Sequence, residues 1–307
     1  MENFISNSKY QKNKAGWYLL GTITYLIFSG VIMALPLYFI MNYYEVSSFS
    51  LNKPLIESLN LLIGIVFSFL GGIIGLKLMF KYIHKSTLQN IISTSNKIRI
   101  NRIVWGFVIL FSFNIMTDII NYLFNPNDYQ FLGLSSFRVI MFFAFLILIP
   151  IQAGAEELLC RGYLMQGIFR TTKSVWTSII LQSLIFALLH SANPEVLKFN
   201  PIYIYLSYIS TGIFFGLLTI FDNGIELAIG MHAASNIYSL SIINYKNSAI
   251  PTNSFFNAIE INPQYSFYLG ILSYVLILVI CYYLFKWEEI RKNLSKIEIE
   301  ENLIPLD

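Results

Sequence analysis

The sequence predicts an all-α fold: a polytopic membrane bundle of about eight transmembrane helices with both termini in the cytoplasm. Of its 307 residues, 56% are hydrophobic and 12% are charged, whereas about a quarter of the residues of a soluble globular protein are charged. Long apolar runs alternate with short polar connections, as expected for helices that cross a bilayer. Lysine and arginine gather in every second connection, which is typical of the cytoplasmic side.

The first half of the chain holds four apolar segments, expected as helices over residues 17–41, 59–80, 103–124 and 137–170. Pro36 predicts a kink in the first segment, and a group of glycines allows close helix packing in the second. The third ends at the turn 125–128, which carries no positive charge. The fourth passes Pro150 and ends before Lys173.

The second half holds four more segments, expected over residues 175–191, 202–221, 225–245 and 266–287. Asn193 and Pro194 stop the first of these helices, and the tight turn 222–224 separates the next two. A longer polar loop that contains Pro251 precedes the last helix.

Basic residues cluster at four places that this topology puts on one side of the membrane: 9–14, 81–102, 161–173 and 286–292. The positive-inside rule therefore supports the topology. His84 lies in the second cluster and is expected to be a solvated loop histidine. The clusters form no continuous basic face, so nucleic-acid binding is not expected. Cys160 and Cys281 lie in apolar runs and are interpreted as small buried hydrophobic residues.

Five ionisable residues inside the predicted helices are costly to bury unless they are paired or used, and they are Glu156, Glu157, Arg161, His190 and His232. Glu157 and Arg161 are four residues apart with the acid first, the favourable order for an ion pair. Glu156 points about 100° away around the helix, on the face that holds Gln152 and Cys160. We therefore expect Glu157 to be structural and Glu156 to be free for chemistry.

Counting residues from the turn 170–173 brings Glu156 and His190 to a similar depth, since they lie about 14 and about 17 residues from it. His232 lies only about eight residues beyond the turn 222–224, so its helix must start deeper or tilt to meet them. Asn236 follows His232 by one turn on the same face. A carboxylate, two imidazoles and an amide in a dry cleft can activate water and bind a metal ion or an oxyanion, which favours a hydrolase.

Each of these residues also has an interpretation without catalysis. A buried His or Asn often makes interhelical hydrogen bonds, and a Glu–Arg pair can simply hold two helices together. The same buried charges could relay protons or ions in a transporter or channel. A third alternative is a non-catalytic membrane partner, such as an immunity or scaffold protein.

Three motifs on separate helices favour the enzyme, and they are Glu156-Glu157-Leu158-Leu159-Cys160-Arg161, Phe186-Ala187-Leu188-Leu189-His190 and His232-Ala233-Ala234-Ser235-Asn236. This ordered set resembles the CPBP family of intramembrane proteases, which includes the CAAX prenyl endopeptidases and the bacterial Abi or bacteriocin-processing proteins. The resemblance covers about residues 137–245. From the charge and hydropathy pattern we expect a basic cytoplasmic leader over 1–16, one transmembrane domain over 17–287 and a charged cytoplasmic tail over 288–307. The resemblance implies a catalytic core at about 137–245.

The resemblance implies a role for each motif residue. Glu156 would activate the attacking water, and His190 would contact the same water. His232 and Asn236 would stabilise the tetrahedral oxyanion.

In the same resemblance Glu157 and Arg161 would support the site. Members of the family are often called metalloproteases, and whether a metal takes part stays open. A zinc ion could be held by three side chains, with Asn236 or water as the fourth ligand; the three are Glu156, His190 and His232. The same side chains could also act without a metal.

We expect the protein to reside in a bacterial plasma membrane, in contact with membrane lipids, because its abundance of Ile, Asn and Lys is typical of an AT-rich bacterial genome. The expected substrate is a hydrophobic or membrane-associated peptide, or a lipid-anchored protein. A bacterial owner favours the processing of a peptide pheromone or bacteriocin, or self-immunity, over cleavage of a prenylated protein. The cleft is expected to open to the cytoplasmic side.

Overall fold

The computed structural model describes residues 4–5, 14–32, 34–45 and 51–287. The tail expected over 288–307 lies outside these residues, as does most of the leader. The longer helices are α1 (Ala15–Ile27), α2 (Ala34–Tyr43), α3 (Leu55–Met79), α5 (Ile100–Phe124), α6 (Ser136–Glu157), α7 (Met165–Thr172), α8 (Val175–Leu189), α10 (Pro201–Asp222), α11 (Glu226–Ile237) and α12 (Pro263–Phe285). Two short helices, α4 (Gln89–Ile92) and α9 (Pro194–Lys198), lie in connections.

The predicted all-α polytopic membrane bundle is confirmed, and every predicted segment contains a helix. Within the described residues, six helical stretches are long and apolar enough to cross a membrane: Ala15–Tyr43, Leu55–His84, Ile100–Phe124, Ser136–Thr172, Pro201–Asp222 and Pro263–Phe285. The helices α8 and α11, with 15 and 12 residues, are shorter than a bilayer-spanning helix, which needs about 20 residues. The count of about eight spans and the side of the termini stay predictions.

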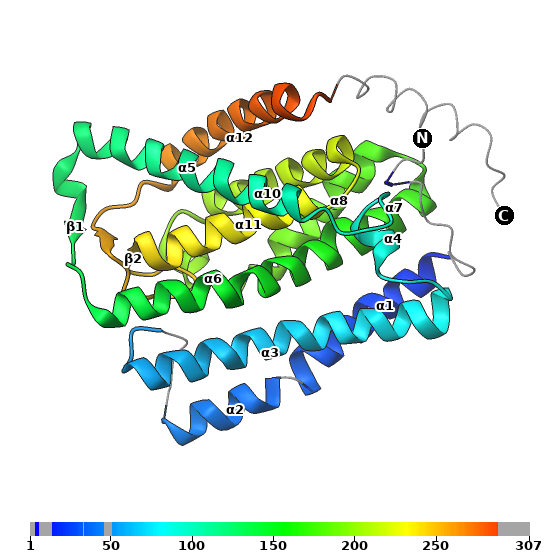
Figure 1. The fold of residues 1–307 in the computed structure, drawn as a ribbon, viewed down its shortest axis with the longest axis horizontal. Coiled ribbons are helices and arrows are strands. Elements are labelled where there is room, and N and C mark those ends of the chain that lie inside the picture. The colour runs from blue at the N-terminus through cyan, green and yellow to red at the C-terminus, as the bar shows by residue number, and fades with distance from the viewer. Residues whose placement is uncertain (1–3, 6–13, 33, 46–50, 288–307) are drawn as a thin grey trace.

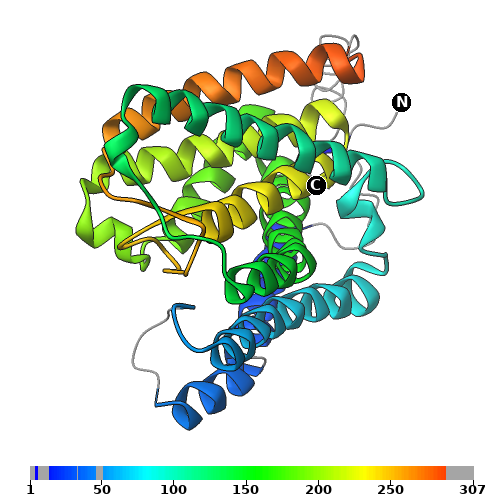
Figure 2. The ribbon, with the colours of Figure 1, turned by 60° about the vertical axis from the view of Figure 1, so that its left-hand side comes forward.

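The helix α6 lies between two parts of the bundle, as Figures 1 and 2 show: α1, α2 and α3 pack on one side of it, and α11 packs on the other. In turn α11 contacts α5 and α10, and α10 contacts α8 and α12. Because α11 is enclosed by these helices, nearly all of its residues are buried. Gly106 of α5 and Gly230 of α11 each lie against the backbone of the other helix, where a Cβ atom would clash. This close contact fixes α11 beside α5.

The start of α11 is buried beneath the segment 92–102. Arg99 Nη2 lies 2.6 Å from Glu226 Oε2 and 3.1 Å from Asp222 Oδ2, and Arg102 contacts Asp222 at 3.3 Å. The backbone N–H of Ile225 donates to Ile92 at 2.8 Å. The turn 222–224 is therefore covered by the preceding loop. Since α11 starts below the surface, His232 lies deep enough to meet the site residues of α6, although only about eight residues separate it from the turn 222–224.

Three short strands pair at one end of the bundle, at the left of Figure 1. They are β1 (Tyr129–Phe131), β2 (Ile243–Tyr245) and β3 (Phe256–Ala258), in the order β1-β3-β2. β3 is antiparallel to β1 and parallel to β2. We call this the sheet end. The basic end, opposite, carries the loop 81–102 and Lys173.

The prediction for His84 was wrong. Its side chain is fully buried, and its Nε2 atom lies 2.9 Å from the hydroxyl of Tyr163. The stretch Phe80–His84 continues α3 as a π-helical turn, so this histidine belongs to a helix that packs inside the bundle. Cys160 and Cys281 are buried free cysteines, as predicted.

Candidate active site

The two adjacent carboxylates are the last residues of α6, and a π-helical turn, Leu158–Leu164, follows them directly. Such turns occur often at functional sites, because a wider turn changes the direction in which side chains leave the helix. Here Glu157 and Arg161 are fully buried, whereas the side chain of Glu156 is 16% exposed. The neighbours thus face different surroundings.

Glu157 holds two partners on one oxygen. Its Oε1 atom accepts from Arg161 Nη1 at 2.8 Å and from His232 Nδ1 at 2.7 Å. The Arg161 guanidinium also lies over the ring of Phe186, at 4.6 Å from its centroid, and over that of Phe215 at 5.2 Å. The predicted ion pair is present, and it positions a histidine from another helix.

The orientation of His232 follows from that contact. A carboxylate only accepts hydrogen bonds, so Nδ1 carries a hydrogen and Nε2 points the other way. The Nε2 atom lies 3.7 Å from Oε2 of Glu156. Phe215 stacks on the imidazole, with ring centroids 5.4 Å apart. His232 therefore stands between the two carboxylates, held by Glu157 and directed at Glu156.

Two side-chain amides, in sequence, fix the position of Glu156. Gln152 Nε2 donates to Glu156 Oε1, and Gln152 Oε1 accepts from Asn236 Nδ2 at 2.8 Å. The other carboxylate oxygen, Oε2, is buried and has no protein hydrogen-bond partner. One oxygen is thus held in place, and the other is free to contact a substrate or a water molecule.

His190 lies at the C-terminal end of α8, with its Nδ1 atom 2.8 Å from the carbonyl oxygen of Phe186. Because a carbonyl accepts, Nδ1 carries the hydrogen and Nε2 keeps a free lone pair. The Phe186 and His190 rings lie 4.4 Å apart. Among the described residues no hydrogen bond or ion pair joins His190 to Glu156. His232, and not His190 as expected, is the imidazole nearest to Glu156, since Glu157 draws it there.

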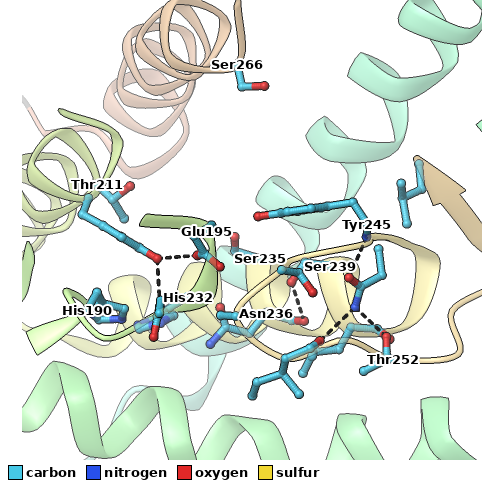
Figure 3. A pocket seen from close by; sticks show the side chains of 18 of the residues that line it. His190, Glu195, Thr211, His232, Ser235, Asn236, Ser239, Tyr245, Thr252 and Ser266 are labelled. Atoms are coloured by element: carbon cyan, nitrogen blue, oxygen red, sulfur yellow. Dashed lines mark hydrogen bonds between the residues drawn. The ribbon is translucent and has the colours of Figure 1, made fainter. Parts of the chain in front are cut away.

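These residues surround one cavity of about 2080 Å³. Its lining includes four of the predicted site residues, namely Glu156, His190, His232 and Asn236. Glu157 and Arg161 lie behind the lining. Figure 3 shows His190, His232 and Asn236 grouped at one side of the cavity, with Glu195 above them. The structure therefore brings the three motifs together. Four of their residues line the cavity, and Glu157 and Arg161 support them from behind.

The cavity opens at the sheet end. Strand residues such as Tyr129 and Asn257 line it, together with most of the segment 243–252. In the part of the chain that the structure describes, no lining residue comes from the loop 81–102 or the turn 222–224 at the basic end. The cavity is thus closed at that end. Its mouth lies opposite the basic loops, so the predicted cytoplasmic position of those loops and the predicted cytoplasmic mouth cannot both hold.

Three further polar residues at the cavity belong to none of the motifs: Gln152, Glu195 and Tyr208. Gln152 was placed on the face of Glu156 by helix geometry, but its bond to Asn236 needed the tertiary structure. Glu195 accepts from the Tyr208 hydroxyl, and the Tyr208 ring lies 4.7 Å from that of His190. Glu195 follows the residues that stop a helix in the sequence. At such a position, a buried carboxylate cannot be distinguished from one in an exposed loop.

The described polar side chains of the cavity do not form a metal site. A zinc ion requires three or four side chains that converge at about 2.0–2.3 Å from one point. Within the described residues, no group of three or more His, Cys, Asp and Glu side chains is arranged to hold a metal ion. The Nδ1 contacts of both histidines leave their Nε2 atoms available, as in zinc-binding histidines, so it is the spacing of the donor atoms, and not their orientation, that fails to form a metal site among the described residues. The arrangement does not fit zinc, so we derive no step through a metal.

The part of the chain that resembles known proteins is the part that carries this site. Residues 135–238 match the family of type II CAAX prenyl endopeptidases described as Rce1-like. A curated relative, the uncharacterized protein YyaK of Bacillus subtilis (strain 168), is 31% identical over 262 residues, which cover 83% of this chain and 84% of the relative. The chain belongs to the Rce1-like family. No solved structure matches it.

The Rce1-like match begins just before α6 and ends just after α11, so it includes all six predicted site residues. As a member of this family, the protein is a multi-pass membrane protein and a CAAX-protease-type peptidase. The helices α1–α3, α5 and α12 lie outside the match and pack around the matched core.

Proposed function

We propose that this Rce1-like protein is an intramembrane endopeptidase in which Glu156 activates water without a metal ion. The observation that carries the proposal is the position of His232: Glu157 holds its Nδ1 atom, and its Nε2 atom lies 3.7 Å from Glu156 Oε2 on the cavity wall. A buried carboxylate beside an oriented imidazole is suited to general acid–base catalysis.

In the first step, a water molecule in the cavity gives a proton to Glu156 Oε2 and attacks the carbonyl carbon of the scissile peptide bond. The second hydrogen of this water is directed to His190 Nε2, the lone pair that its bond to Phe186 leaves free. The π bond of the carbonyl opens, and a tetrahedral oxyanion forms.

His232 and Asn236 stabilise this oxyanion. Glu157 and Arg161 form an ion pair, so the oxyanion is the negative charge left once Glu156 has taken the proton from water. To donate to this oxyanion, His232 has to carry hydrogens on both ring nitrogens, with Nδ1 held by Glu157. Asn236 uses one amide hydrogen on Gln152 and keeps another for the substrate.

In the last step, Glu156 returns its proton to the peptide nitrogen. The carbonyl re-forms, the C–N bond breaks, and an amine and a carboxylic acid leave. No electrons are exchanged with a cofactor, so the reaction is a balanced hydrolysis.

The substrate of the proposed enzyme is a hydrophobic peptide or a lipid-anchored protein in a bacterial plasma membrane, for example a bacteriocin or pheromone precursor. The size of the cavity supports this class, since about 2080 Å³ accommodates several residues of an extended peptide. The closed basic end supports hydrolysis over the alternative of an ion relay, which requires a path through the whole membrane.

The experiment compares peptides released from membranes that contain the wild type with those from membranes that contain Glu156→Gln. We expect the variant to fold and to lose its specific cleavage products, because an amide cannot accept the proton from water. Glu260→Gln, at the rim of the same cavity, is the matched control and keeps the products. Unchanged cleavage by the folded Glu156→Gln protein would disprove the role of Glu156 as the base.

A further inference from the structure

The cavity mouth and the basic loops lie at opposite ends of the bundle. The loop 243–262 and strand β1 form the mouth, where the pocket reaches Asn125, Asp128 and Glu260. Figure 1 shows these strands at the left, and α4 and α7, beside the basic loops, at the right. Among the described residues, the basic end contributes no opening, so the route from water to Glu156 starts at the sheet end.

Lysine and arginine are concentrated at the other end. Those of the basic end among the described residues are Lys14, Lys77, Lys81, Lys85, Lys97, Arg99, Arg102, Arg170, Lys173 and Lys286. Fewer lie near the sheet end: Lys53, Arg138, Lys198 and Lys246. The orientation of a membrane protein follows the Lys and Arg content of its short loops, with the richer side in the cytoplasm. All loops concerned are far shorter than about 60 residues, the range in which this rule applies.

We infer that the active-site cavity opens on the non-cytoplasmic side of the membrane, so that the protein cleaves peptide segments presented there. The inference rests on the proposed function for the cleavage itself, and it replaces the cytoplasmic cleft expected from the sequence. The substrate class is a membrane-embedded or secreted hydrophobic peptide whose scissile bond lies at the outer surface.

Two exposed asparagines provide a matched test. Asn127 lies at the sheet end between α5 and β1, and Asn96 lies at the basic end between α4 and α5. Asn127→Cys and Asn96→Cys are each expressed in cells and treated with a membrane-impermeant maleimide before and after permeabilisation. The wild type is the background control, since Cys160 and Cys281 are buried.

We expect Asn127→Cys to react in intact cells and Asn96→Cys to react only after permeabilisation. The reverse pattern would overturn the inference. Labelling needs no proteolysis, so the outcome is independent of the proposed function. If Asn127→Cys reacts in intact cells while Glu156→Gln leaves cleavage unchanged, the proposed function fails and the orientation stands.

A second inference rests on Glu195. Its residue is 7% exposed, and its Oε1 atom accepts from the Tyr208 hydroxyl, which Asn193 also contacts at 2.8 Å. Its Oε2 atom is buried without a protein hydrogen-bond partner and lies in the cavity wall. An unpaired buried carboxylate oxygen is costly. A cation in the cavity would remove that cost.

The surrounding charges favour the same ligand. The acidic residues of the lining besides Glu156 are Asp118, Asp128, Glu195 and Glu260, whereas Lys246 is the basic one among the described lining residues. Asp118 already accepts from Tyr238 at 2.7 Å and from Tyr129 at 3.0 Å. Glu195 therefore combines an unsatisfied oxygen with a place beside His190, to which the Tyr208 ring connects it.

We propose that Glu195 binds a lysine or arginine side chain of the substrate close to the scissile bond. Randomised peptides are incubated with detergent-solubilised wild type, Glu195→Gln and Glu260→Gln, and cleavage sites are read by mass spectrometry. We expect Lys and Arg to be enriched about tenfold at one position by the wild type and by Glu260→Gln. Glu195→Gln should lose this enrichment and still cleave.

Equal enrichment by Glu195→Gln would overturn the assignment. A binding measurement makes the test independent of cleavage. The same peptides are retained on Glu156→Gln and on the double variant Glu156→Gln/Glu195→Gln, and the retained sequences are compared. Enrichment of Lys and Arg by the first protein alone supports the subsite, and equal retention by both contradicts it.

Discussion

The Nδ1 atom of His232 lies 2.7 Å from Oε1 of Glu157, the oxygen that Arg161 also contacts at 2.8 Å. One buried oxygen thus sets the tautomer of a histidine on α11 and the rotamer of an arginine on the π-helical turn. Glu157 faces no part of the cavity, yet it controls the side chains that do.

Replacing Glu157 by glutamine should therefore reduce kcat strongly. The amide can present a donor to Nδ1 and favour the wrong tautomer of His232, which in other His–carboxylate pairs costs up to about 10⁴-fold in rate. We expect a loss of about 10²–10⁴-fold in kcat with little change in KM, together with a lower Tm because Arg161 loses its counter-charge. Glu45→Gln, on an exposed loop residue, is the control. A folded Glu157→Gln protein with wild-type kcat would contradict this role.

Gln152 links Asn236 to Glu156, and Gln152→Leu removes both hydrogen bonds while keeping a similar volume. We expect kcat to fall about 10–100-fold because Glu156 is no longer fixed. Gln152→Glu places a second carboxylate beside Glu156 and should lower kcat further. Steady-state rates on a released peptide measure both. If Gln152→Leu keeps the wild-type rate, the amide chain does not position the base.

The donor arrangement predicts that proteolysis survives the removal of divalent metal. Purified protein is dialysed against a chelator, its zinc content is determined by elemental analysis, and its activity is compared with that of the untreated sample. We expect unchanged activity in metal-free protein. Loss of activity that added zinc restores would show that the histidines and Glu156 rearrange around an ion.

Burial raises the pKa of the Glu195 carboxyl above its usual range, although the hydrogen bond from Tyr208 opposes the rise. A group with a higher pKa in the folded than in the unfolded state binds protons more tightly when folded, so stability falls as the pH rises through the interval between the two values. Glu195→Gln stays neutral and should have a higher Tm than the wild type at neutral pH. The difference should shrink below about pH 4, where both states of the wild type are protonated.

Glu260→Gln serves as the control in these melting curves, because this residue is exposed. A difference between Glu195→Gln and the wild type that is the same at every pH would show that the substitution acts through packing and not through charge.

Arg99 joins the start of α11 to the loop before α5, and its loss leaves the buried Glu226 without its ion-pair partner, whereas Asp222 keeps Arg102. Removing one partner of a buried ion pair costs about 3–5 kcal/mol. We expect Arg99→Ala to lower Tm markedly, whereas Lys97→Ala, on an exposed neighbour, has little effect. Equal melting temperatures would show that α11 is anchored by helix packing alone.

The helix positions followed from hydropathy, because each apolar run is bounded by charged or turn-forming residues. Hydropathy could not show that α11 is enclosed by protein and starts beneath the segment 92–102, since burial in protein and burial in lipid select the same apolar residues. The separate roles of Glu156 and Glu157 followed from helix periodicity, and the Arg161 ion pair agrees with that prediction. The histidine nearest to Glu156 could not be predicted from helix periodicity, because the pairing of His232 with Glu157 depends on how α6 and α11 are packed.

The residues missed by the motifs share one property. Gln152, Glu195 and Tyr208 act through contacts between different helices or loops, and nothing in their local sequence marks them. His84 shows the same limit, since a histidine in a basic stretch was buried by the continuation of α3.

The closure of the cavity at the basic end has a kinetic consequence. Because there is no exit at that end, both halves of a cleaved peptide have to leave on the side at which the next substrate arrives. A product that is still bound blocks binding of the substrate, so product inhibition should be competitive, and turnover is limited by how quickly the more hydrophobic fragment moves sideways into the lipid or out into water.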